Sequence, residues 1–237
     1  MKKALLIVLA IALTPFSAFA VDGVVLINDS IVKAMGGYPY IITKPGSYRL
    51  SGNLDVRTAP DPANTTAIQI NVGNVTIDLN GFSIIGPTVC TGTPGTPVTS
   101  CSPTADPFSN GGYGVVVFGS SEAITVINGT VSGMGASGIS LGFSGGIVEK
   151  VHANSNGVNG IVVADGTVSG STASSNGNVG IEVQRSTVSG NAVSLNGGSG
   201  ILAGCPSSIF GNTAVMNGLM NLRTFGAGCS VALNAAP

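Results

Sequence analysis

The side chains best suited to chemistry in this sequence are a few charged or titratable groups in its second half. Past residue 110 they are Glu122, Glu149, Lys150, His152, Asp165, Glu182, Arg185 and Arg223. Such groups can transfer protons, or bind a sugar through charged hydrogen bonds, only where they converge in space. Asp165 and Arg185 each stand eleven residues before an asparagine of a repeating series. That shared spacing predicts that the two side chains are neighbours.

This pair is the centre of a candidate site. Glu182 precedes Arg185 by three residues, so a site for an acidic or hydroxyl-rich sugar could use Arg185, with Asp165 and Glu182 fixing it. The alternative is a surface ion pair, which contributes at most about 1 kcal/mol to stability. His152 is a further weak catalytic candidate. Its alternative is an exposed or hydrogen-bonded structural residue.

Aromatic side chains give a second candidate site, because a sugar ring packs its apolar face on a flat side chain. The sequence has no Trp, and its four tyrosines all precede the regular repeats. They are Tyr38, Tyr40, Tyr48 and Tyr113. A glycan would bind where an N-terminal cap and an insertion flank the early repeats. Alternatively, these tyrosines complete the small core of the cap.

An internal repeat defines the elements that must position these groups. A glycine followed by an aliphatic residue recurs from Gly114 to Gly200 at intervals of 24, 22, 20 and 20 residues. Within GIEVQ, Ile181 and Val183 alternate with polar residues, which predicts a short strand. A single coil has no core of its own, so coils must stack about 4.8 Å apart and bury like residues against like.

A series of asparagines keeps the same period, and each member is followed by glycine. The series is Asn156, Asn176, Asn196 and Asn217. Asparagine tolerates the left-handed backbone conformation, and its amide can both donate and accept along a stack. We therefore expect a structural ladder at a bend between two sheets. A ladder of amides that binds a polar ligand is the alternative.

These patterns resemble the right-handed parallel β-helix of the pectate-lyase-like superfamily. The resemblance is densest from Gly138 to Asn217. It extends upstream through ITKPGSYRLSGNL (42–54) and NVTIDLNGFSIIG (74–86), which resemble the opening coils of secreted bacterial β-helix repeat proteins. The implied fold is all-β, a single-stranded right-handed parallel β-helix (solenoid) of about 7–9 coils of 20–24 residues.

One β-helix domain is expected at 21–237. Within it, residues 21–54 would form the N-terminal cap and first coil, and 88–110 an inserted loop. Residues 112–237 would form the regular coils and the C-terminal closure.

The first twenty residues, MKKALLIVLAIALTPFSAFA, have the basic, apolar and small-residue regions of a signal peptide cleaved after Ala20. We expect a secreted, periplasmic or cell-surface protein with no transmembrane segment in the mature chain. Four cysteines remain, and in an exported protein an even number favours disulfides. The expected pairs are Cys90 with Cys101 and Cys205 with Cys229, and free buried thiols are the alternative. Neither spacing indicates a metal site.

Composition excludes two classes of protein. Charged residues make up 8% of the chain, where about 25% is usual, so no basic face is available to bind nucleic acid. Hydrophobic residues make up 43%, which is too many for a disordered chain.

The superfamily that the chain resembles includes polysaccharide lyases, polygalacturonases, epimerases, tailspikes and adhesins. Its enzymes gather several carboxylates that bind calcium beside a basic residue, or several aspartates that act as acid and base. The charged residues here match neither pattern. We therefore expect an exported scaffold that binds a cell-surface glycan or protein partner without catalysis and without a cofactor. The alternative is a polysaccharide lyase or glycoside hydrolase acting on an acidic polysaccharide, the only case in which calcium is expected. Monomer and homo-oligomer both stay open.

Overall fold

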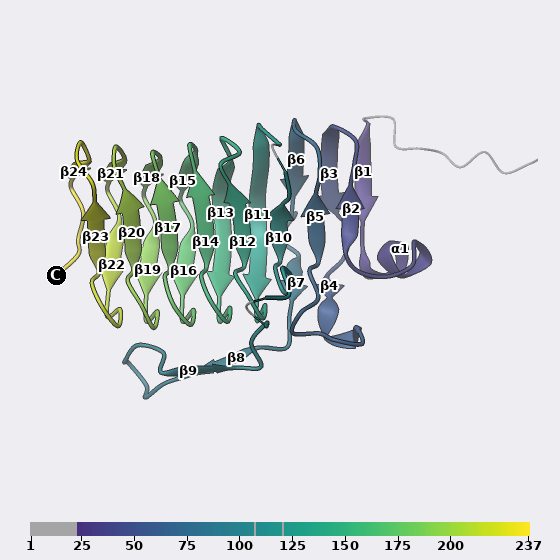
Figure 1. Ribbon diagram of the computed structural model, residues 1–237, viewed down its shortest axis with the longest axis horizontal. Coiled ribbons are helices and arrows are strands. Elements are labelled where there is room, and N and C mark those ends of the chain that lie inside the picture. Colours follow the sequence, from purple (N-terminus) through teal and green to yellow (C-terminus); the bar gives the residue numbers. More distant parts are fainter. Residues whose placement is uncertain (1–22, 107, 120) are drawn as a thin grey trace, which may run out of the picture.

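The computed structural model describes residues 23–106, 108–119 and 121–237. The expected signal peptide, at residues 1–20, lies outside this part of the chain. The described strands stack along one axis, and the chain makes about nine turns around it (Figure 1). Stacked strands pair in parallel, with Ile161 beside Ile181 and Ile181 beside Ile201. The predicted all-β solenoid is confirmed.

The stacked strands form three rows in two sheets. The first row of the 14-stranded sheet is β1 (Val24–Ile27), β3 (Gly46–Leu50), β6 (Val75–Asp78), β11 (Ile124–Ser132), β13 (Ile147–Asn154), β15 (Thr167–Ser169), β18 (Thr187–Ser189), β21 (Ser208–Phe210) and β24 (Ser230–Ala232). Its second row shares β11 and β13 and adds β4 (Leu54–Asp55), β7 (Ser83–Ile85), β16 (Thr172–Ser174), β19 (Ala192–Ser194) and β22 (Thr213–Val215). The 8-stranded sheet is β2 (Tyr40–Ile42), β5 (Ile68–Ile70), β10 (Val115–Val117), β12 (Ile139–Gly142), β14 (Ile161–Ala164), β17 (Ile181–Gln184), β20 (Ile201–Gly204) and β23 (Leu222–Phe225).

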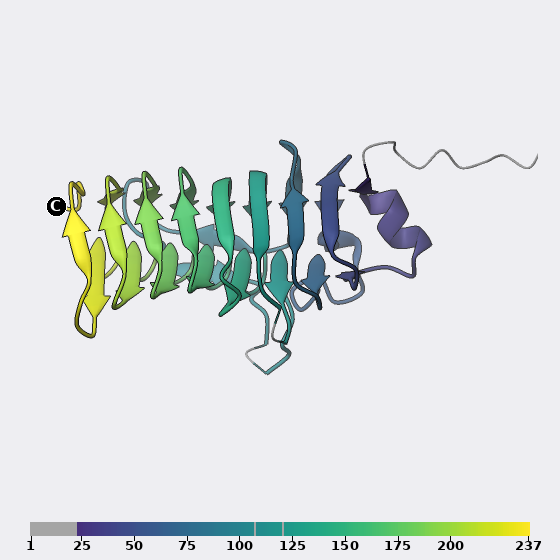
Figure 2. The same ribbon diagram turned by 90° about the horizontal axis from the view of Figure 1, so that it is seen from above.

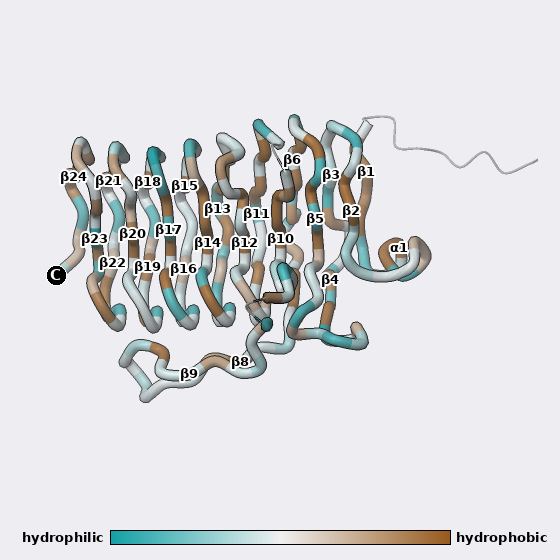
Figure 3. Tube along the Cα trace, viewed as in Figure 1, coloured by the Kyte–Doolittle hydropathy of each residue, from teal (hydrophilic) through white to brown (hydrophobic). Residues whose placement is uncertain are grey.

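Alternation along each strand builds the core. In β17, Ile181 and Val183 are buried. The residues that alternate with them, Glu182 and Gln184, are only partly buried. The buried residues of one coil stack on those of the next, so apolar residues follow the strands along the whole shaft (Figure 3). Burial of each large aliphatic side chain contributes about 1.5–3 kcal/mol relative to exposure. The core is therefore continuous along the axis.

The asparagine series lies inside the turns that lead from the second row to the 8-stranded sheet. Asn156, Asn176 and Asn196 are fully buried, and each amide bonds to the next one along the stack. The residue in the left-handed conformation is the one before each asparagine, such as Ser175 with φ 56°. The backbone preference that we assigned to asparagine was wrong, because its role is to satisfy buried polar groups.

A second buried ladder runs beside the turns between the first and second rows. Asn191 donates to Asn212 over 2.9 Å, and Asn212 donates to Asn234 over 2.9 Å. The preceding coil has Ser171 in this position, and its backbone N–H donates to the Asn191 side chain. Gly170 precedes Ser171 with φ 54°, the same value that Lys150 adopts one coil earlier.

The two ends of the shaft differ. Strand β1 pairs with β3, and the short helix α1 (Asp29–Ala34) covers the N-terminal end, with Val32 fully buried (Figure 2). Asn28 caps this helix by accepting a hydrogen bond from the N–H of Ile31 over 3.0 Å. At the other end Val231 stacks on Ile209 but is 50% exposed. Cys229 and Ala236 pack against the core at this end, and the N–H of Ala214 donates to the carbonyl of Ala235 over 2.8 Å. The closure expected of the last residues stays a prediction.

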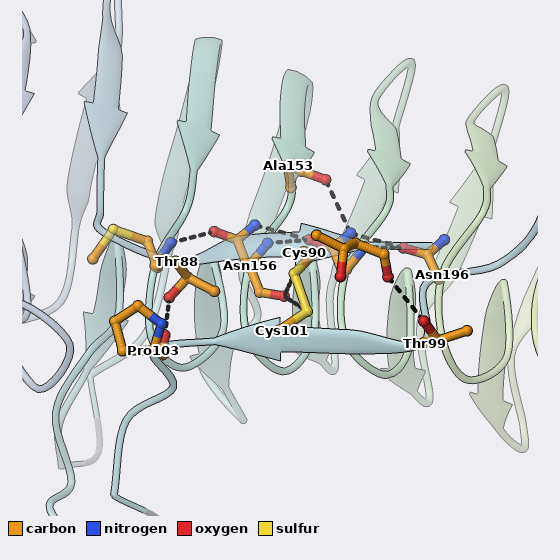
Figure 4. Close-up of a disulfide and its surroundings, with 11 residues drawn as sticks. Thr88, Cys90, Thr99, Cys101, Pro103, Ala153, Asn156 and Asn196 are labelled. Carbon is orange, nitrogen blue, oxygen red and sulfur yellow. Dashed lines mark hydrogen bonds between the residues drawn. A yellow bond between two sulfur atoms is a disulfide. The ribbon is translucent and has the colours of Figure 1, made fainter. Parts of the chain in front are cut away.

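Within the insertion expected at 88–110, the described residues 88–106 leave the stack (Figure 1). They contain an antiparallel hairpin of β8 (Val89–Thr91) and β9 (Ser100–Ser102), linked by the Cys90–Cys101 disulfide. The hairpin runs along the asparagine turns of several coils, where the Cys90 sulfur lies 3.6 Å from the carbonyl oxygen of Asn156 (Figure 4). The second disulfide joins Cys205 to Cys229. Both predicted pairings are confirmed. A short 3-10 helix, Val56–Thr58, follows β4.

Candidate functional site

The Asp165 and Arg185 side chains do meet at the surface. Each residue follows a strand of the 8-stranded sheet and has positive φ, 57° and 49°, so the two stack one coil apart. Nε and one terminal nitrogen of Arg185 donate to the two carboxylate oxygens of Asp165, both over 2.7 Å. These hydrogen bonds hold the pKa of the Asp165 carboxyl below its ordinary value. Both side chains remain about 40% exposed.

Glu182 does not join this pair. Its carboxylate accepts a hydrogen bond from the Asn159 side chain over 2.7 Å. Asn159 lies before β14 whereas Arg185 follows β17, so the two contacts are at opposite ends of these paired strands. Arg185 instead lies over the ring of Phe143, with 5.4 Å between the guanidinium carbon and the ring centroid. The expected three-residue cluster around Arg185 therefore does not form. What forms is an exposed ion pair with an aromatic neighbour.

His152 lies on another face of the shaft. It is exposed on β13, and its Nδ1 is 2.8 Å from the Thr172 hydroxyl one coil away. Nearby, Glu149 forms an ion pair with Lys150 over 3.0 Å. Within the described ranges, no three His, Cys, Asp or Glu side chains gather to hold a metal ion. The charged candidates are thus distributed over separate contacts.

The four tyrosines take different positions. Tyr40 and Tyr48 are 8% and 6% exposed and pack edge to face in the core of the first coils. Burial raises the pKa of both hydroxyls. Tyr113 is partly buried, and its carbonyl accepts the N–H of Ala67. Tyr40 and Tyr48 thus pack in the core of the first coils.

Tyr38 is the tyrosine that lines a cavity. Its hydroxyl donates a hydrogen bond to Asp29. Burial, and to a smaller extent this hydrogen bond, raise the pKa of the Tyr38 hydroxyl. The cavity has a volume of about 260 Å³. Its walls are Tyr38, Pro39, Asn64, Thr65, Thr66, Gln69, Asn110, Gly111 and Phe118. We call it the Tyr38 groove.

The Tyr38 groove joins four segments that are far apart in the sequence. Asn64 comes from the loop before β5 and accepts the N–H of Asp106 over 2.8 Å, which ties the insertion to the shaft. Gln69 points outward from β5 and donates to Asn71 over 2.9 Å. Phe118 follows β10 and is 37% exposed. Amides and hydroxyls thus surround an aromatic surface, a composition that suits a polyhydroxylated ligand.

Of the groove residues, only Tyr38 was predicted from the sequence to contact a ligand. The first coils lack the regular repeat, so their register could not be read from spacing. The only local signal is Gln69, a polar residue between two buried isoleucines in AIQI, which indicates an outward-facing position.

A family model described as "Right handed beta helix region" matches residues 108–236, which is more than half of the chain. This chain belongs to the right-handed β-helix family. The match begins inside the insertion and ends in the last coil, so it covers the regular coils of this β-helix protein and leaves out most of the Tyr38 groove.

No curated protein matches this β-helix protein. In the described part of the chain, no helix is long and apolar enough to cross a membrane.

Proposed function

We propose that this β-helix protein is an exported, non-catalytic scaffold that binds a glycan in the Tyr38 groove. The observation that carries the proposal is the composition of that groove. Asn64, Gln69, Asn110 and two threonines line the same cavity as Tyr38 and Phe118. Sugars need both kinds of surface, because their hydroxyls bond to amides while their ring faces pack on aromatic carbon.

The groove is also organised before a ligand arrives. The hydrogen bond from Tyr38 to Asp29 fixes the aromatic ring, and the Asn64 side chain is held by Asp61 and by the N–H of Asp106. A preformed site loses less conformational entropy on binding.

Three carboxylates of the regular coils support binding rather than acid and base catalysis. Glu149, Asp165 and Glu182 each bond to a different partner, namely Lys150, Arg185 and Asn159. A glycoside hydrolase needs two such groups at one glycosidic bond. The two disulfides and the N-terminal signal segment support export, since disulfides persist in oxidising compartments.

The test is calorimetric titration of the purified protein with neutral and acidic oligosaccharides. Gln69→Ala removes one amide from the groove and should raise Kd about tenfold, the effect of one lost hydrogen bond. Gln184→Ala is the matched control, because Gln184 is a partly buried glutamine on β17 of the same sheet, outside the groove. Equal affinity of the wild type and Gln69→Ala would refute the assigned site. Unsaturated products or new reducing ends in the same mixture would refute the non-catalytic role.

A further inference from the structure

A second cavity opens beside the Tyr38 groove, at an irregularity in β12. Ser140 pairs with Val162, but Gly142 pairs with Val163, so Leu141 is an extra residue in the ladder. On its other side β12 pairs with β10 only through two residues, Ile139 and Ser140. Such β-bulges interrupt the regular spacing of strands and often lie beside binding sites.

The opening has a volume of about 480 Å³. We call it the bulge cavity, and its walls are Val117, Gly119, Glu122, Leu141, Gly142, Phe143 and Ser144. Leu141 is 1% exposed and forms its inner part, whereas Phe143 is 69% exposed and stands at its mouth. The cavity therefore combines a buried apolar wall with an accessible aromatic ring.

Ser144 provides an independent sign of a ligand. Its side chain is 1% exposed, and its backbone carbonyl accepts the N–H of Ala123 over 2.9 Å. Among fully buried side-chain oxygens and nitrogens in residues 23–106, 108–119 and 121–237, its hydroxyl is the one without a hydrogen-bond partner. A buried hydroxyl without a partner is unfavourable, so its presence in a cavity wall calls for a group that bonds to it.

The charge of the bulge cavity selects among ligands. Glu122 is the only charged residue in its walls, and it is exposed. Arg185 covers one face of the Phe143 ring and is paired with Asp165, so that ion pair is internally neutral. A carboxylate only accepts hydrogen bonds, and it binds most strongly to a cationic donor. The cavity thus favours a ring that carries an ammonium group.

The bulge cavity and the groove share one segment of the chain. Phe118 lines the groove, and its neighbours Val117 and Gly119 line the bulge cavity. The proposal takes the two cavities as subsites for one glycan chain.

We propose that the bulge cavity is a second subsite that takes an amino sugar of the bound glycan. The ammonium group of the sugar binds the Glu122 carboxylate, and the ring face packs on Phe143. A ring hydroxyl bonds to Ser144 after rotation of that side chain turns its buried hydroxyl toward the cavity. This inference rests on the proposed glycan-binding function and adds the class of sugar to it.

The test uses three β-1,4-linked hexamers of equal length, composed of glucosamine, N-acetylglucosamine or glucose, titrated at pH 6 and low salt. The glucosamine hexamer should bind about tenfold more tightly than the glucose hexamer, the effect of one charged hydrogen bond. Glu122→Gln should abolish that preference and leave glucose-hexamer binding unchanged. Glu149→Gln is the matched control, because it removes a carboxylate from β13 of the other sheet, away from both cavities.

Ser144→Ala separates a ligand-binding role from a structural one. It should weaken glucosamine-hexamer binding without lowering Tm, since it removes a buried hydroxyl that has no partner. A lower Tm with unchanged affinity would overturn the role of Ser144 as a ligand contact.

The remaining outcomes separate the two proposals. Hexamer binding with no preference for the amine, or a preference that survives Glu122→Gln, would overturn the amino-sugar subsite and leave the groove intact. Competition by tetralysine as strong as that by the glucosamine hexamer would assign the bulge cavity to a basic peptide instead. No binding of any hexamer to the wild-type protein would overturn glycan binding itself.

Discussion

Asn176 and Asn196 lie one coil apart with their side chains fully buried, and the amide nitrogen of Asn176 donates to the side-chain oxygen of Asn196 over 2.8 Å. The same oxygen accepts the backbone N–H of Asn176 over 3.0 Å. The second amide hydrogen of Asn176 bonds to the carbonyl of Ala153 over 3.1 Å. Asn176 thus ties three consecutive coils together through its side chain.

Replacement of Asn176 by alanine should therefore destabilise the protein strongly. It removes these bonds and also leaves the buried Asn156 amide, which donates to Asn176 over 2.9 Å, without its acceptor. We expect a loss of about 3 kcal/mol in the free energy of unfolding, measured by urea denaturation.

Asn178→Ala is the control for this substitution. Asn178 lies in the same turn, two residues later, but is exposed, so its loss should cost about 0.5 kcal/mol or less. Equal effects of the two substitutions would show that the ladder does not stabilise the stack.

The positions of the ladder could be predicted because stacking enforces a constant period, and each coil then repeats the same residue at the same place. The reason why asparagine occupies these positions could not be predicted, since the residue in the left-handed conformation is Ser175 rather than Asn176. The ladder through Asn191 was missed because it extends over few coils and begins at a serine, Ser171.

The candidate site was harder to predict for a related reason. The pairing of Asp165 with Arg185 follows from the period alone, and it was found. The contact of Glu182 with Asn159 depends on how far each side chain reaches, which spacing does not determine. The Tyr38 groove and the bulge at Leu141 arise where the repeat is irregular, so periodicity contains no information about them.

The Cys205–Cys229 disulfide should hold the last coil in place. This coil pairs with neighbours on one side only, through β20 with β23 and β21 with β24. The bridge closes a loop of 24 residues, and the chain-entropy model assigns such a loop about 3.5 kcal/mol. The double variant Cys205→Ser with Cys229→Ser should therefore speed amide hydrogen exchange in β23 and β24 while β14 to β19 stay protected.

The Cys90→Ser with Cys101→Ser double variant is the matched control for this experiment. That bridge lies in the hairpin of β8 and β9, so its loss should leave exchange in β23 and β24 unchanged. Faster exchange throughout the shaft in the Cys205 and Cys229 variant would contradict a local role.

The Asp165–Arg185 pair should contribute to the pH dependence of stability at acid pH. Hydrogen bonds from Arg185 lower the pKa of Asp165 below 3.8, so the folded state binds fewer protons than the unfolded state. The stabilisation is complete above that value and is lost as the pH falls through the lowered pKa. Asp165→Asn should therefore flatten the decline of Tm between about pH 4 and pH 2.

Arg185→Gln should flatten the acid decline in the same way, because it removes the partner that lowers the pKa of Asp165. Part of the decline should remain in both variants. The pKa of Asp55 is also lowered, chiefly by its hydrogen bonds with Arg57. If Tm declined with falling pH in both variants as it does in the wild type, the pair would make no contribution to the pH dependence of stability.

Close approach of adjacent coils should make Gly166→Ala far more damaging than Gly170→Ala. A Cβ atom at Gly166 would lie 2.0 Å from the carbonyl oxygen of Gly146, which is backbone and cannot move without separating two coils. At Gly170 nothing lies closer than a Lys150 side-chain carbon at 3.9 Å, and only the positive φ of 54° disfavours alanine. We expect a loss of about 1 kcal/mol at Gly170 and of about 3 kcal/mol or more at Gly166, measured by urea denaturation. A similar loss at both positions would mean that backbone conformation, rather than the spacing of the coils, limits which residues these turns accept.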